Sequence, residues 1–153
     1  DIRKKAGQII INGIEQGSSV KQVIFNLNEF FENNYTYNNI QSIPGRLGTV
    51  VRTNVTKAYN YGRRQFFESK SLGGFVEAYQ YSAVLDSRTT DICDQLDGKI
   101  YKVDDPYIDK ITPPLHYNCR SVLIPMVEGD SFKISNYAVK ESDLLAFDGG
   151  ISG

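Results

Sequence analysis

The sequence predicts an α+β fold, in which N-terminal helices are followed by a long helix and a small antiparallel sheet with a loop-rich Cys/His motif. Two observations support this prediction. Apolar side chains recur at helical spacing through the first half of the chain, and short β-branched and aromatic runs bounded by glycine and proline follow in the second half. A chain of 153 residues with 41% hydrophobic side chains is also long enough to bury one core of its own.

Two helices are predicted within residues 1–44. Apolar side chains at helical spacing indicate the first helix over residues 2–15. Ser19 and Gln22 have the spacing of a capping box at the start of a second helix, which is expected to end near Glu32. We expect these helices to form a short hairpin, and the absence of an initiating methionine suggests that they end a larger helical region.

A polar stretch over residues 33–39 predicts a loop, and Pro44-Gly45 punctuates the chain before the next periodic segment. Residues 47–67 have the apolar spacing of a long helix. Its charged side chains are all basic, so they usually indicate a solvated face. These basic residues, counted from just before the helix, are Arg46, Arg52, Lys57, Arg63 and Arg64.

Three segments predict a sheet of two or three strands. A strand is expected from residue 75 to its end at Asp86, a second over residues 99–103, and a third over residues 121–125. Together with the long helix they define a predicted α+β domain over residues 45–125. Residues 126–153 lose strong periodicity and are expected to form a C-terminal extension that is partly flexible.

Both cysteines and the only histidine lie between Asp86 and Arg120. Thiolate and imidazole are ligands that zinc prefers, and His116 and Cys119 are close enough in sequence to share one ion. The sequence therefore predicts a structural zinc site of Cys93, His116 and Cys119, with Asp86 or Asp91 as the fourth ligand.

Other roles for these residues stay open at this point. Cys93 and Cys119 are also compatible with small buried core residues. A disulfide between them is a third alternative, which the reducing compartment indicated by so few cysteines disfavours. Asp86 is also suited to a bidentate ion pair with Arg120, since a planar guanidinium matches a carboxylate. The sequence Leu96-Asp97-Gly98-Lys99 is typical of a turn between short strands, with Gly98 free to adopt positive φ.

The same segment resembles a known family. The patterns D-x-R-T-x-x-x-C from Asp86, L-D-G-K from Leu96 and P-P-x-H-x-N-C-R from Pro113 are similar to those of the phage Mu F-like minor head proteins. The resemblance covers roughly residues 45–125. It implies a non-enzymatic protein of head morphogenesis, with portal and capsid proteins as partners. It further implies a place in the virion, inside the head near the portal, and in the bacterial host cytoplasm during assembly.

Composition and motifs restrict the remaining function classes. No apolar run is long enough to cross a membrane, and a formal net charge of −1 gives no global field for a polyanion. A weak, sequence-independent DNA contact through the five basic residues of the long helix stays open. The alternative to a head protein is a nuclease-like or toxin-like enzyme centred on His116, for which the sequence offers no phosphate loop and no second histidine.

Overall fold

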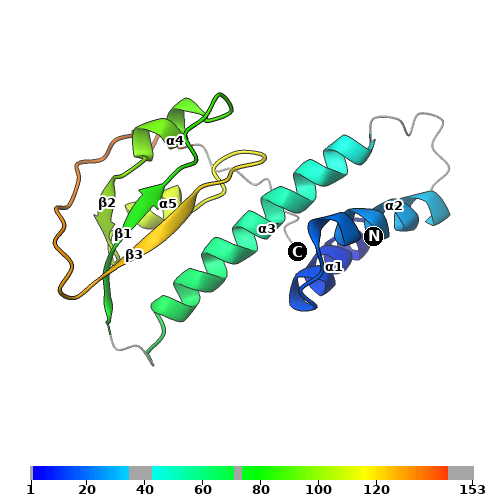
Figure 1. Ribbon diagram of the computed structural model, residues 1–153, viewed down its shortest axis with the longest axis horizontal. Helices are drawn as coiled ribbons and strands as arrows, with labels where there is room; N and C mark the ends of the chain where they lie inside the picture. The colour runs from blue at the N-terminus through cyan, green and yellow to red at the C-terminus, as the bar shows by residue number, and fades with distance from the viewer. Residues whose placement is uncertain (1, 35–42, 71–73, 145–153) are drawn as a thin grey trace. The chain divides into compact units, whose positions relative to one another are not determined.

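The structure, a computed structural model, describes residues 2–34, 43–70 and 74–144 (Figure 1). It confirms the predicted α+β class. The chain divides into two compact units, one formed by the residues up to Val55 and the other beginning at Thr56, so the longest helix contributes to both. In chain order the elements are α1 (Ile2–Glu15), α2 (Val20–Asn34), α3 (Ile43–Phe67), β1 (Val76–Ser82), α4 (Asp91–Leu96), β2 (Ile100–Lys102), α5 (Tyr107–Ile111) and β3 (Val122–Val127).

The first unit is helical, as predicted. One apolar cluster joins α1, α2 and the N-terminal half of α3, with Val51, Leu27 and Val23 as its most buried members. A Cβ atom at Gly13 would lie only 2.4 Å from the nearer Val23 methyl carbon, so glycine allows α1 to approach α2 closely. Such an interlocked contact is typical of well-packed interiors.

Half of the predicted capping box forms at the start of α2. The backbone N–H of Gln22 donates to Ser19 Oγ at 3.2 Å, which satisfies one of the free amides of the first turn. The Gln22 side chain instead donates to Asn26 at 3.0 Å. The predicted loop over residues 33–39 begins later than expected because α2 continues to Asn34, and its remaining residues lie outside the described ranges.

The second unit contains a three-stranded antiparallel sheet in the order β2-β1-β3 (Figure 1). Tyr79 of the central strand pairs with Tyr101 of β2 on one side and with Pro125 of β3 on the other. The tyrosines at positions 79, 81 and 101 are all buried, together with Leu96 of α4 and Ile108 of α5. The sheet therefore shares one apolar core with the two short helices.

The first strand is shorter than the sequence predicted. It ends at Ser82 rather than near Asp86, because the next backbone groups bond to side chains instead of to a neighbouring strand. The Ala83 N–H donates to Asp97 Oδ1 at 2.8 Å, and Thr89 Oγ1 donates to the Val84 carbonyl at 2.6 Å. Local bonds of this kind compete with strand pairing and start a turn.

The predicted turn at Asp97-Gly98 forms, but it joins α4 to β2 rather than two strands. Gly98 has φ of 72°, a conformation that glycine adopts without steric cost. Its N–H donates to the Tyr81 carbonyl and thereby leads the chain from α4 into β2. The predicted boundaries of the three segments, 1–44, 45–125 and 126–153, stay predictions.

Two side chains on one stripe of α3 bond to the outer edge of β3 and to the residues just before it. Thr56 Oγ1 donates to the Cys119 carbonyl at 2.9 Å. Asn60 donates to the Ser121 carbonyl at 3.2 Å and accepts from the Leu123 N–H at 3.1 Å. Four residues of helix advance about 6 Å, nearly the length of two strand residues, so side chains one helical turn apart match alternate positions of a strand.

The outer edge of β2 is covered by a segment that we term the tail strap, residues 134–141. Ser135 donates its backbone N–H to the Ile100 carbonyl at 2.8 Å and accepts the Ile100 N–H on its side-chain oxygen at 3.1 Å. Tyr107 OH donates to the Val139 carbonyl at 2.7 Å, and its ring stacks on Tyr137 with centroids 4.2 Å apart. This part of the predicted C-terminal extension is therefore bound to the second unit.

Candidate metal centre and family membership

Two separate segments bring the cysteines and the histidine together. Cys93 lies on α4, while His116 and Cys119 lie in the loop between α5 and β3. One potential ligand atom from each lies within 4.8 Å of the other two. Around a tetrahedral zinc, neighbouring ligand atoms are roughly 3.6 to 3.8 Å apart, as the usual Zn–S and Zn–N bond lengths require. The group can therefore hold a metal ion after small side-chain movements.

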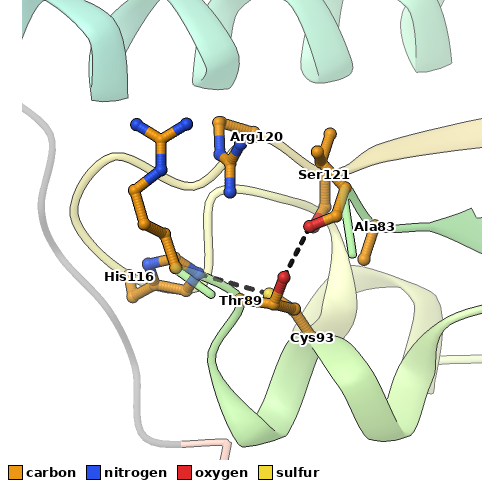
Figure 2. A pocket seen from close by; sticks show the side chains of 8 residues that line it. Ala83, Thr89, Cys93, His116, Arg120 and Ser121 are labelled. Carbon is orange, nitrogen blue, oxygen red and sulfur yellow. Dashed lines mark hydrogen bonds between the residues drawn. The ribbon is translucent and has the colours of Figure 1, made fainter. Parts of the chain in front are cut away.

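The hydrogen bonds of His116 leave one ring nitrogen suited to a metal. Nδ1 lies 2.8 Å from the Tyr117 carbonyl oxygen, which can only accept, so this nitrogen carries the proton. Nε2 then presents a lone pair and lies 3.3 Å from Cys93 Sγ (Figure 2). Metal-binding histidines commonly donate their second nitrogen to a backbone carbonyl in this way, which fixes the tautomer and the orientation of the ring.

The two cysteines are free thiols in unlike environments. A hydrogen bond from Cys119 lowers the pKa of Cys93 below its usual value, with burial opposing this effect and the Ser121 and Tyr81 hydroxyls adding to it. The same contact, together with burial, raises the pKa of Cys119. Tyr81 OH lies 3.2 Å from Cys93 Sγ. Cys93 is thus the thiol that becomes a thiolate first, the form in which cysteine binds metals.

Asp86 is placed differently from the three other predicted ligands. Its two carboxylate oxygens accept from the Arg120 guanidinium at 2.6 and 2.7 Å, which is the bidentate pair that the sequence offered as an alternative. This hydrogen bond, aided by the Arg88 N–H, holds the pKa of the Asp86 carboxyl well below its usual range. Asp91 lies in the first turn of α4 and is exposed. Within the described ranges, neither carboxylate belongs to the Cys93, His116 and Cys119 group.

The residues that hold the ligand loop on α3 were not predicted. Thr56 bonds to the carbonyl of Cys119 itself, and Asn60 donates to the Ser121 carbonyl and accepts from the Leu123 N–H of β3. Asn60 is 2% exposed, which is unusual for an amide side chain in a helix. A polar pair spaced i, i+4 on the buried side of a helix was the available sequence signal.

The basic side chains of α3 do not form one uniform solvated face. Arg64 is 12% exposed and is bonded to Glu68 and Asp109, each at 2.8 Å. The Arg63 guanidinium lies over the Tyr59 and Phe67 rings, 5.1 and 5.3 Å from their centroids. Arg46 and Arg52 are exposed and belong to the first unit, whereas Lys57 is half-buried and belongs to the second. A DNA contact through the five residues stays a prediction.

Comparison with known proteins places these features in a family. The sequence profile described as "Phage Mu protein F like protein" matches residues 4–124. The Mu-like prophage FluMu F protein of Haemophilus influenzae is 37% identical over 102 residues, which cover 66% of this chain and 22% of that protein. The putative capsid assembly protein F of Escherichia phage Mu is 31% identical over 77 residues, which cover 50% of this chain and 17% of that protein.

The chain thus spans about a fifth of the length of these curated relatives, at 22% and 17%. No solved structure matches it. No helix among the described residues is both long enough and apolar enough to cross a membrane. The profile match extends over both compact units and includes the residues of the Cys/His group, and the resemblance read from those residues is confirmed. The chain belongs to the phage Mu protein F-like family.

Proposed function

We propose that the chain acts in phage head morphogenesis as part of a minor head protein without enzymatic activity. The single observation that carries this proposal is the family match over residues 4–124. A relative from Escherichia phage Mu, named as a putative capsid assembly protein, supports the same function. In this proposal the partners are portal and capsid proteins. The protein is made in the bacterial host cytoplasm and resides in the virion, inside the head near the portal.

The Cys/His group serves this function as a structural zinc site held by Cys93, His116 and Cys119. Both cysteines are at most 2% exposed, and the histidine has one nitrogen available. The ion supplies folding free energy, because it ties α4 to the loop before β3, two segments otherwise joined through a small core. Asp86 stays the predicted fourth ligand, although its bidentate bonds to Arg120 favour the ion-pair role.

The enzymatic alternative receives less support from the site. The 3.3 Å contact between His116 Nε2 and Cys93 Sγ has the form of a base and a nucleophile, but Cys93 is only 2% exposed. The second ring nitrogen of His116 bonds to a backbone carbonyl rather than to a carboxylate. The arrangement therefore suits a ligand set better than a catalytic pair.

Head assembly is tested in the phage or lysogen that encodes the chain. Particles are purified from a strain carrying the gene, from a deletion strain, and from the deletion strain with the gene restored. We expect mass spectrometry to find the chain in purified particles, and electron microscopy to find fewer or malformed heads in the deletion strain only. Absence of the chain from the particles, together with normal head yield after deletion, would contradict the proposal.

Zinc binding is tested on protein purified without chelator. Elemental analysis should give about one zinc per chain with two free thiols under denaturing conditions, and His116→Ala should lose the metal. Asp86→Asn separates the two roles of that residue, because it abolishes zinc binding if the carboxylate is a ligand and preserves it if the carboxylate only pairs with Arg120. A metal-free wild-type protein would refute the zinc site.

A further inference from the structure

A surface pocket opens directly onto the candidate metal centre. Its enclosed space is about 10 Å³, with room for roughly one water-sized group such as a single carboxylate oxygen, and its lining contains both Cys93 and His116. Figure 2 shows these two side chains on one side of the pocket, with Arg120 and Ser121 across from them. When Asp86 keeps its bidentate pair with Arg120, the ligands Cys93, His116 and Cys119 leave one position of a tetrahedral ion to be filled, and a ligand atom can reach that position through the pocket.

The charges at this pocket favour an anion. Two arginines, Arg88 and Arg120, belong to its lining, and the described residues that line it include no carboxylate. Asp86 neutralises one positive charge through its bidentate bonds to Arg120. Arg88 lies 3.6 Å from Asp86 and its side chain is 76% exposed, so it retains most of its freedom to meet another anion. The three side chains carry a net charge of about +1.

We propose that this pocket is a carboxylate site, in which Arg88 and the fourth position of the zinc bind the same carboxylate group. The inference rests on the zinc site of the proposed function. A zinc ion with two thiolates and one neutral imidazole has no net charge, so an anionic fourth ligand adds a single negative charge that Arg88 offsets. Arginine and zinc both bind carboxylate oxygens, whereas a neutral ligand gains nothing from the arginine.

The ligand is either a small carboxylic acid or an acidic side chain of another head protein, since both carry the same group. This chain has the features that such a ligand needs, namely a pocket with room for one carboxylate oxygen, a positive charge at its mouth and a metal position that no described carboxylate occupies. The bidentate Asp86–Arg120 pair stays intact in this arrangement and orients the side of the pocket opposite His116.

The experiment uses the intact chain loaded with Co²⁺ alone, because cobalt in a thiolate site gives visible absorption that changes with its ligands. Acetate is titrated in at constant pH and ionic strength, with perchlorate as the background salt. We expect a saturable change in the cobalt spectrum. Arg88→Ala should weaken acetate binding about fivefold, since one unit charge near 4 Å in a well-solvated site contributes about 1 kcal/mol.

Lys133→Ala is the matched control, because Lys133 is exposed and does not line the pocket. The acetate affinity of this variant should equal that of the wild type. N-acetylglutamate amide serves as a second probe. If this probe binds more tightly than acetate, the natural ligand is an acidic side chain of a partner protein. If it binds more weakly, the natural ligand is a free small acid.

A cobalt spectrum that does not change when either probe is added would show that the site is closed and would overturn the proposal. Failure to bind cobalt at all would overturn the zinc site as well, whereas neither result bears on head assembly, which is measured in particles.

Discussion

Replacing Asn60 with alanine tests the connection between α3 and the sheet. The substitution removes one side chain that bonds to two buried backbone groups of the β3 edge, the Ser121 carbonyl and the Leu123 N–H. Each buried group left without a partner costs about 1 to 3 kcal/mol. Alanine returns about 0.5 kcal/mol through its higher helix propensity. For the two groups together, we therefore expect the free energy of unfolding to fall by about 1.5 to 5.5 kcal/mol.

Asn54→Ala is the matched control in the same helix. Asn54 donates to the Val50 carbonyl, one turn earlier, so its loss removes a local bond while the gain in helix propensity is the same. We expect a change within about 0.5 kcal/mol for the control. Urea unfolding is followed by far-UV circular dichroism and by tyrosine fluorescence, since the chain has 10 tyrosines and no tryptophan. Equal stabilities of Asn60→Ala and Asn54→Ala would refute the role assigned to Asn60.

Removal of zinc by a chelator should lower the melting temperature of the wild type, and His116→Ala should melt at the temperature of the chelated protein with or without added metal. Burial raises the pKa of Tyr101 to about 12, so the folded state keeps this phenol neutral after the unfolded chain has begun to ionise. The contribution of Tyr101 to the free energy of unfolding is therefore complete below about pH 10 and is lost as the pH rises from there to about 12. In urea titrations at alkaline pH, the free energy of unfolding of Tyr101→Phe should decline less steeply with pH than that of the wild type. Gly98→Ala should destabilise by about 1 kcal/mol because φ is 72°, although no atom crowds the position. Gly62→Ala, in open space on α3, should stabilise the protein by about 0.5 to 1 kcal/mol. Changes of opposite sign in the free energy of unfolding by urea for Gly98→Ala and Gly62→Ala would separate backbone strain from helix propensity.

The long elements could be predicted from the sequence because each repeats its pattern several times. The α1 bounds agree with the predicted residues 2–15, and α3 begins four residues earlier than predicted, with Pro44 in its first turn. The helices α4 and α5 were missed. They contain only 6 and 5 residues, too few for a helical period to repeat, and the packing of their apolar side chains against the sheet determines them.

The candidate site could be predicted in its chemistry but not in its connections. Residue type and spacing identified Cys93, His116 and Cys119, since few side chains suit a soft metal. Whether Asp86 faces the metal or Arg120 depends on a contact across 34 positions of the sequence, which no local pattern encodes. The anchoring of the ligand loop by Thr56 likewise spans 63 positions, and the tail strap fell in a segment without periodicity.

A three-stranded sheet has two outer edges, and in this chain each already has a partner within the same polypeptide. Side chains of α3 occupy the β3 edge, and Ser135 occupies the β2 edge. Exposed strand edges are the sites at which folded proteins join into fibrils or exchange strands. Backbone pairing of another chain at these positions would first have to displace α3 or the tail strap, so we expect contacts with other proteins to use side-chain surfaces.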